Sequence, residues 1–123
     1  MHLSYVREGA GHALIGFRQW IPEEHITDPV RSLRSALPLD LTFRTKGQLA
    51  IDICTTAAAD GIRPDFYRGD EVYGSCTELR AHFEADEQAY VLRVQKNFRI
   101  TLPSRTVLSA AEAVKTLLKR KRQ

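Results

Sequence analysis

Residues 66–74 constrain the fold of this chain more than any other segment. Their pattern is that of a short strand that ends at Asp70 and then turns into a helix. Beyond that helix, residues 89–94 form a nearly continuous apolar run, which is typical of a strand covered on both faces. Strand, helix and strand with short connections predict a βαβ unit with parallel strands and a right-handed crossover. Open sheets of this kind hold their sites beyond the carboxyl ends of the strands, where Asp70 is expected to lie.

The N-terminal part has the pattern of a hairpin. Residues 2–6 form a short extended run, and residues 7–11 contain the glycines of a loop. Residues 12–21 then carry β-branched and aromatic side chains and end before Pro22. Because two adjacent strands with a short loop pair antiparallel, we expect an antiparallel hairpin here.

The segment after the hairpin is expected to be irregular. Residues 23–41 are mixed in character, and Pro29 and Pro38 argue against a long element. Residues 41–44 predict one more short strand.

Three segments carry the capping-box pattern, which opens a helix. In this box a hydroxyl at the N-cap and a Glu or Gln three residues later each bind the other's backbone N–H. The boxes begin at Thr45, Ser75 and Ser109. Each precedes apolar residues at helical spacing: Leu49, Ala50, Ile53, Cys54, Ala57 and Ala58; Leu79 and Phe83; and Val114, Leu117 and Leu118. Gly61 and Pro64 predict the end of the first helix.

Composition limits the class of protein. The chain has 123 residues, which fits one domain, and its 43% hydrophobic and 27% charged residues exclude a disordered chain. No apolar run is long enough to span a membrane, and the N-terminus lacks the pattern of a signal peptide. The expected compartment is therefore the cytoplasm. Two cysteines, Cys54 and Cys76, do not make a disulfide framework and are expected to be small buried hydrophobic residues in helices.

The formal net charge is +3, and the cations are not evenly spread. Five of them gather near the C-terminal end: Lys115, Lys119, Arg120, Lys121 and Arg122. Two interpretations stay open for this cluster. It is a solvated helix end, where cations suit the helix dipole, or it contacts the backbone of a nucleic acid.

A carboxylate at a strand end also has two uses. Asp70 can accept hydrogen bonds from the following turn and helix start, where negative charge is favoured. Alternatively it can bind Mg²⁺, which prefers oxygen ligands and takes one or two carboxylates together with substrate phosphates. Cleavage of a phosphodiester by two such ions needs several converging carboxylates, and Asp70 supplies one. Glu71 is not expected to share the ion, because consecutive strand residues point to opposite faces.

Several blocks of the sequence resemble bacterial insertion-sequence transposases of the DDE class. In order they are HLSYVR (2–7), GHALIG (11–16) with RQWIP (18–22), TKGQLAID (45–52), GDEVYG (69–74) and YVLRV (90–94). The resemblance covers almost the whole chain. It implies a ribonuclease H-like fold, an Asp-Asp-Glu triad that binds Mg²⁺, and DNA as the partner.

By this resemblance Asp70 corresponds to the second aspartate, which ends the fourth strand of the family's fold and is both a catalytic residue and a metal ligand. The family's first aspartate and its glutamate have no counterpart in residues 1–123, and neither Glu71 nor Glu112 is assigned to those roles. In the family's sheet the first strand lies between the hairpin and the strand that carries Asp70. A chain without it leaves unpaired edges on both halves of its sheet.

We therefore expect an α/β chain with a partial ribonuclease H-like fold, made of an antiparallel hairpin plus a βαβ unit. It would lack the first strand and the C-terminal catalytic helix. Residues 1–123 would be a fragment of one transposase catalytic domain, inactive alone, whose intact form cuts DNA at element ends and joins it to target DNA. The intact enzyme is compatible with a homo-oligomer. Two alternatives remain: a non-catalytic DNA-binding remnant or small α/β binding module, and a gene fragment without a folded product.

Overall fold

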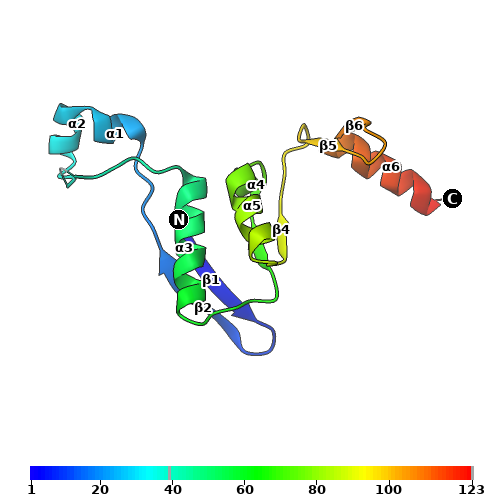
Figure 1. Cartoon of the computed structure of the whole chain (residues 1–123), viewed down its shortest axis with the longest axis horizontal. Coiled ribbons are helices and arrows are strands. Elements are labelled where there is room, and N and C mark those ends of the chain that lie inside the picture. The colour runs from blue at the N-terminus through cyan, green and yellow to red at the C-terminus, as the bar shows by residue number, and fades with distance from the viewer. Residues whose placement is uncertain (39, 123) are drawn as a thin grey trace.

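The computed structural model describes residues 1–38 and 40–122 of the chain. The elements in these residues are β1 (His2–Arg7), β2 (Gly11–Phe17), α1 (Glu23–Thr27), α2 (Pro29–Arg34), α3 (Lys46–Ala59), β3 (Tyr67–Gly69), α4 (Glu71–Gly74), α5 (Thr77–Ala85), β4 (Tyr90–Leu92), β5 (Arg99–Thr101), β6 (Val107–Ser109) and α6 (Ala110–Arg122). In Figure 1 the hairpin, α3, α5 and the β3–β4 pair occupy the centre, and two arms extend from it. One arm holds α1 and α2, and the other holds β5, β6 and α6. The predicted α/β class is confirmed.

The strands of the described residues form three separate two-stranded sheets. β1 and β2 pair antiparallel, as the sequence predicts for the hairpin. β3 and β4 pair in parallel, with Tyr67 opposite Tyr90 and Gly69 opposite Leu92. The two helices α4 and α5 lie in the connection between them, which confirms the strand–helix–strand unit. β5 and β6 pair antiparallel in the C-terminal arm.

The core lies where α3 and α5 meet the sheets. Its buried members come from the two predicted apolar stripes: Ala50, Ile53, Cys54, Leu79 and Phe83. The ring of Phe83 stacks between the rings of Tyr67 and Tyr90, with centroids 4.9 and 5.5 Å away. This aromatic stack fastens α5 onto both strands of the parallel pair, because each tyrosine belongs to a different strand.

Two of the three predicted capping boxes are confirmed. Thr45 Oγ1 accepts from the Gln48 N–H at 3.1 Å, and Gln48 Oε1 accepts from the Thr45 N–H at 2.9 Å. Ser109 and Glu112 exchange the same two bonds at the start of α6. The box at Ser75 is wrong. Ser75 ends α4 in a helical conformation, whereas an N-cap residue is extended, so Cys76 becomes the N-cap of α5 without a side-chain bond.

The segment between the hairpin and α3 also differs from the prediction. Residues 23–41 contain two short helices, and Pro29 begins α2 because the first helical position needs no N–H donor. Asp28 caps this helix, accepting from the Val30 N–H at 3.0 Å. The strand predicted at 41–44 is wrong, since no neighbouring strand satisfies the backbone groups there.

Two predicted strands are shorter than expected. The run at 12–21 is a strand only to Phe17, because Phe17 already pairs with His2 at the start of β1. The run at 89–94 is a strand over Tyr90–Leu92, and it is not covered on both faces. Val91 is 59% exposed because successive strand residues alternate faces and only one face of the two-stranded sheet packs on the core.

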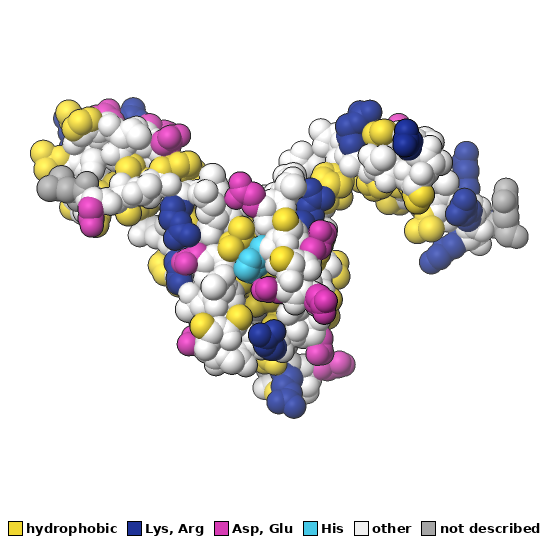
Figure 2. Space-filling model, viewed as in Figure 1, with side chains coloured by type: hydrophobic (Ala, Val, Ile, Leu, Met, Phe, Trp, Pro, Cys, Tyr) yellow, Lys and Arg dark blue, Asp and Glu magenta, His cyan; other side chains and the backbone are white. Residues whose placement is uncertain are grey.

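The C-terminal arm exposes the apolar residues of its helix. The predicted helix after Ser109 is present as α6. However, Val114, Leu117 and Leu118 on it are 55%, 58% and 51% exposed. Figure 2 shows hydrophobic side chains on the surface of this arm, so the third apolar stripe does not contribute to the core.

Candidate functional site

Asp70 lies at the carboxyl end of β3, as the sequence predicts, and is also the N-cap of α4. Its Oδ1 accepts a hydrogen bond from the Val72 N–H at 3.0 Å. The first of the two expected uses of this carboxylate, accepting a hydrogen bond from the following turn and helix start, is therefore present. Within the described residues no hydrogen bond or ion pair engages its second oxygen, and the side chain is exposed. Burial raises the pKa of Tyr73, and the nearby charge of Asp70 raises it further.

The parallel pairing brings the residues after β4 to the same edge as Asp70. The Arg93 N–H donates to the Gly69 carbonyl at 3.0 Å, directly beside the last pair of the ladder. Gly74, the buried last residue of α4, packs against the carbonyl of Arg93. α4 is thus held against the end of β4, and Asp70 is fixed at the shared carboxyl edge of the two strands.

An open polar hollow lies at this edge. It has a volume of about 400 Å³ and is lined by Glu71, from α4, and by Gln95, Lys96 and Asn97, from the segment after β4. The sequence patterns that point to Asp70 do not point to these last three residues. A signal was available, because residues that follow parallel neighbouring strands emerge at the same edge of a sheet.

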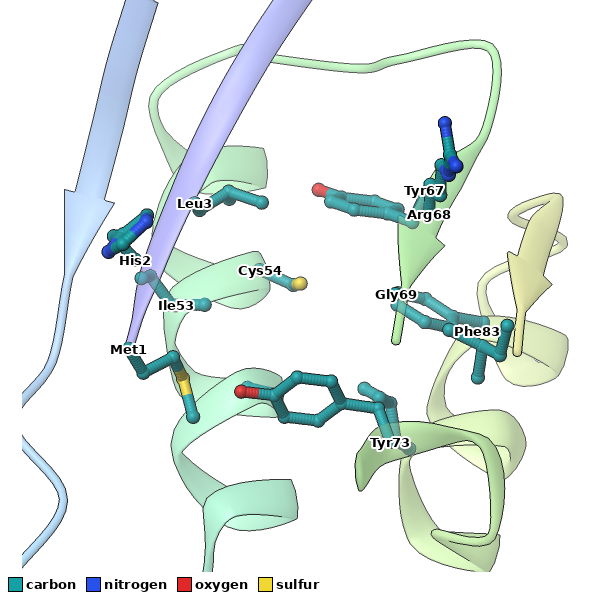
Figure 3. Close-up of a pocket in the computed structure, with 13 residues that line it drawn as sticks. Met1, His2, Leu3, Ile53, Cys54, Tyr67, Arg68, Gly69, Tyr73 and Phe83 are labelled. Carbon is teal, nitrogen blue, oxygen red and sulfur yellow. The ribbon is translucent and has the colours of Figure 1, made fainter. Parts of the chain in front are cut away.

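A second, apolar hollow separates the hairpin from the parallel pair. Residues 1–3 line it on the β1 side and residues 67–69 on the β3 side, and α3 and α5 contribute Ala50, Ile53, Cys54, Leu79 and Phe83. In Figure 3 the strands follow the order β2, β1, β3, β4, with the hollow between β1 and β3. The facing edges of β1 and β3 are both unpaired, since each strand pairs only on its other side. The volume of this apolar hollow is about 80 Å³.

The polar side chains in this second hollow are not activated for chemistry. Burial raises the pKa of the Cys54 thiol to about 11, although a hydrogen bond with Tyr67 acts in the opposite direction. Burial also raises the pKa of Tyr67 to about 12. Both groups are therefore neutral near pH 7, and Cys54 is a buried hydrophobic residue, as predicted. Cys76 is half-buried.

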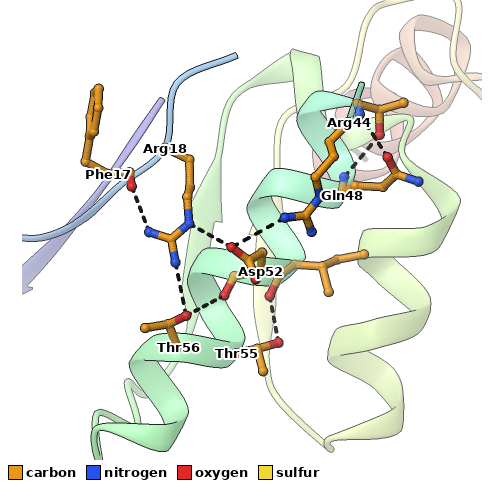
Figure 4. Close-up of polar contacts among 9 residues, drawn as sticks. Phe17, Arg18, Arg44, Gln48, Asp52, Thr55 and Thr56 are labelled. Atoms are coloured by element: carbon orange, nitrogen blue, oxygen red, sulfur yellow. Dashed lines mark hydrogen bonds and ion pairs between the residues drawn. The ribbon is translucent and has the colours of Figure 1, made fainter. Parts of the chain in front are cut away.

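Apart from the two hollows, a cluster of polar side chains joins the end of the hairpin to α3 (Figure 4). Arg18 Nε donates to Asp52 Oδ2 at 2.7 Å, and its Nη2 donates to Thr56 Oγ1 at 3.1 Å. Arg44 Nη1 lies 3.7 Å from the same carboxylate. The hydrogen bond from Arg18 is the main cause that lowers the pKa of Asp52. Asp52 is thus paired with cations, so its carboxylate is better suited to a structural ion pair between α3 and the preceding segments than to binding a metal ion.

Comparison with known protein families shows to which family the chain belongs. The sequence profile described as DDE superfamily endonuclease matches residues 1–117. The chain belongs to this family. The match confirms the DDE class of the resemblance seen in the sequence, and the α/β structure is consistent with a partial ribonuclease H-like domain. No curated protein and no solved structure matches the chain. Membership of a nuclease family implies DNA as substrate, and DDE superfamily endonucleases generally use divalent metal ions.

The described residues do not by themselves form the metal centre of a DDE endonuclease. No group of three or more His, Cys, Asp or Glu side chains among them could hold a metal ion. Asp70 offers one carboxylate oxygen that forms no hydrogen bond or ion pair with any described residue. One exposed carboxylate is too small a donor set for Mg²⁺, which gives up its water reluctantly.

The five clustered cations lie on α6, as predicted: Lys115, Lys119, Arg120, Lys121 and Arg122. All five are exposed, and none forms an ion pair with a described residue. α6 extends away from the β3–β4 pair, so the structure does not bring these cations together with Asp70 (Figure 1). No helix in residues 1–38 or 40–122 is long and apolar enough to cross a membrane.

Proposed function

We propose that residues 1–123 are part of one catalytic domain of a DDE transposase from a bacterial insertion sequence, acting in the cytoplasm. The intact domain would use Mg²⁺ to cleave DNA at element ends and to join the 3′ hydroxyl to target DNA. The observation that carries this proposal is the position of Asp70. It follows β3 at the carboxyl edge of a parallel pair, in a chain whose family is that of the DDE endonucleases.

The local geometry suits Asp70 for the role of one metal ligand. The Val72 N–H fixes one carboxylate oxygen, so the side chain has a set orientation and its second oxygen stays available. Gly69 and Arg93 join the two strand ends beneath it through a backbone hydrogen bond. A rigid support of this kind keeps a ligand in place without the entropy cost of ordering it on binding.

The hollow between β1 and β3 supports the further proposal that other polypeptide completes the domain. Two unpaired strand edges face one apolar space, and the family's first strand would lie between them. A strand placed there would pair with both edges and would end beside Asp70. We propose that the remaining carboxylates come from polypeptide outside residues 1–123, and that the chain alone neither cleaves nor joins DNA.

Plasmid nicking tests this function. The purified 123-residue chain is expected to leave supercoiled plasmid intact in Mg²⁺. A longer protein that adds the polypeptide encoded on both sides is expected to nick it, and Asp70→Asn should abolish the nicking. Asn keeps the N-cap bond, so a loss of activity in this variant reports on the carboxylate and not on folding. Nicking by the short chain that Asp70→Asn abolishes would contradict the proposal.

A readout independent of activity is paramagnetic broadening by Mn²⁺ in an NMR spectrum. In the chain with DNA added, Mn²⁺ should first broaden the amide signals of Glu71 and Val72, which are next to Asp70. The Asp70→Asn variant should lose this selective broadening. Equal broadening in both proteins would show that Asp70 does not bind the ion.

One observation favours a second candidate, a DNA-binding remnant without catalytic activity. The five exposed cations of α6 lie apart from Asp70, so they can contact phosphates whether or not a metal site exists. This candidate predicts salt-dependent DNA binding that survives Asp70→Asn and needs no Mg²⁺. It also predicts that the longer protein binds DNA without nicking it, which is the result that separates the two candidates.

A further inference from the structure

We propose that the polar hollow beside Asp70 holds one nucleotide of the DNA. In this proposal Lys96 pairs with the phosphate, and the side-chain amides of Gln95 and Asn97, with Glu71, bind the edge of the base. The inference rests on the proposed function in one respect, that the chain acts on DNA. It assigns a binding site to residues outside both the metal-ligand candidate and the basic helix.

The position of the hollow follows from the parallel sheet. Gly69 and Leu92 are opposite each other at the ends of β3 and β4, so the two segments that follow these strands leave the sheet at the same level. Asp70 and Glu71 follow one strand, and residues 93–97 follow the other. The lining of the hollow begins at Glu71, one residue after the carboxylate that is proposed to act at the scissile phosphate, so a neighbouring nucleotide of the same strand would pass close to it.

The backbone around the hollow is held in place. The Phe98 N–H donates to the Gln95 carbonyl at 3.0 Å, and the Ala111 N–H donates to the Lys96 carbonyl at 3.1 Å. The Ala110 N–H also donates to the Phe98 carbonyl at 2.7 Å. These bonds anchor the segment to the start of α6, while the side chains of Gln95, Lys96 and Asn97 remain exposed. Binding groups on a fixed backbone lose little freedom when a ligand arrives.

The side chains of the hollow match the parts of a nucleotide. Lys96 forms no ion pair with any described residue, so its ammonium group is available to a phosphate. Gln and Asn amides both donate and accept, and they pair with adenine, while a carboxylate accepts from the amino group of cytosine. Glu71 would repel a phosphate, which places the phosphate at Lys96 and the base toward Glu71. The volume of about 400 Å³ lies within the range of small-ligand sites.

The mixed chemistry favours a nucleotide over a free anion. A site for phosphate alone would gather cations, whereas this hollow combines one cation, one carboxylate and two amides. Adenine and cytosine carry an exposed amino group that a carboxylate or amide oxygen can accept from, and thymine does not. The proposal therefore predicts a preference among bases at one position of the bound strand.

The test measures DNA binding by fluorescence anisotropy in EDTA, over a range of NaCl concentrations. The proteins are the full chain, Lys96→Gln, Gln95→Ala, Asn97→Ala and the control Lys46→Gln. The control removes the same charge from the start of α3, on another part of the molecule. The probes are a duplex and short single strands of only adenine, only cytosine or only thymine. Circular dichroism confirms that each variant is folded.

We expect Lys96→Gln to reduce the slope of log affinity against log salt by about 0.9, the value for one lost phosphate contact, and Lys46→Gln to leave it unchanged. Gln95→Ala or Asn97→Ala should keep the slope but reduce the preference for adenine or cytosine over thymine by about fivefold or more. Equal effects of Lys96→Gln and Lys46→Gln would overturn the site while leaving the proposed function intact. A full chain that binds none of the probes would overturn the site, while the proposed function depends on nicking by the longer protein.

Discussion

Gly74→Ala is the substitution whose consequence follows most directly from the structure. Gly74 is buried at the end of α4, and a Cβ built there would overlap the backbone carbonyl of Arg93 and lie 3.0 Å from Val94 Cγ1. Its φ is not in the left-handed region, which is occupied only by Gly9, Gly11 and Gly61 among the described glycines. The glycine is therefore required for space and not for its backbone conformation.

The expected destabilisation is the balance of two terms. Inserting a methyl group into a packed contact typically costs about 1–3 kcal/mol, and the upper part of that range applies when the obstacle is backbone. Alanine restricts the unfolded chain more than glycine does, which returns about 0.4–1 kcal/mol when the native conformation is allowed. The net loss in the free energy of unfolding is thus about 1–2.6 kcal/mol. Relief of the clash would also move α4 away from β4, and Asp70 with it.

Urea denaturation followed by circular dichroism measures this loss, and amide chemical shifts locate it. The matched control is Gly47→Ala, whose new Cβ would meet the Sγ of Cys76. That thiol belongs to a side chain that can rotate, so the control should be nearly neutral, and adding Cys76→Ala should remove any remaining effect. The reasoning would be refuted if Gly74→Ala were as stable as the parent, or if Gly47→Ala proved the more damaging change.

Three further changes test other contacts. Arg18→Ala should lower the free energy of unfolding by about 1 kcal/mol or less at pH 7. Because Arg18 lowers the pKa of Asp52, this loss should fade as the pH falls below about 4. Equal losses in urea at pH 7 and at a pH below about 4 would contradict this prediction. Cys54, with its pKa raised to about 11, should resist iodoacetamide at about pH 8 while Cys76 is alkylated, as peptide mass spectrometry would show. Asp70→Ala should cost about 1 kcal/mol through the lost N-cap bond and Asp70→Asn almost nothing, so equal urea midpoints would contradict the capping role.

The parts of the fold that could be predicted from sequence are those fixed by local chemistry. The boxes at Thr45 and Ser109 form as expected because every atom of the motif lies within four residues. The same pattern fails at Ser75, since α4 ends there and holds the serine in a helical conformation. A local capping motif therefore does not form when one of its residues, here Ser75, already belongs to the end of the preceding helix. Pro29 similarly predicts a break in the chain, whereas in the structure it is the first residue of α2.

The same distinction between local patterns and contacts between distant segments applies to the candidate site. The position of Asp70 at a strand end follows from the local pattern, and the structure has it there. Lys96 and its neighbours could not be chosen locally, because their relation to Asp70 depends on the pairing of Gly69 with Leu92, 23 residues apart in the sequence. The exposed face of β4 has the same origin: the apolar run predicts a strand with two covered faces, but coverage depends on strands and helices elsewhere in the sheet.

Under the proposed function, the strand that completes the sheet and the residues that complete the metal site are physically linked. A strand between β1 and β3 would bury Leu3 and Tyr67 and pair two free edges, so it would stabilise the fold. The same strand would end beside Asp70, where a second carboxylate is required. Gains in stability and in metal binding should therefore appear together as the polypeptide is extended. An extension that raised the melting temperature without strengthening Mn²⁺ binding at Asp70 would separate the sheet from the site and would favour the non-catalytic candidate.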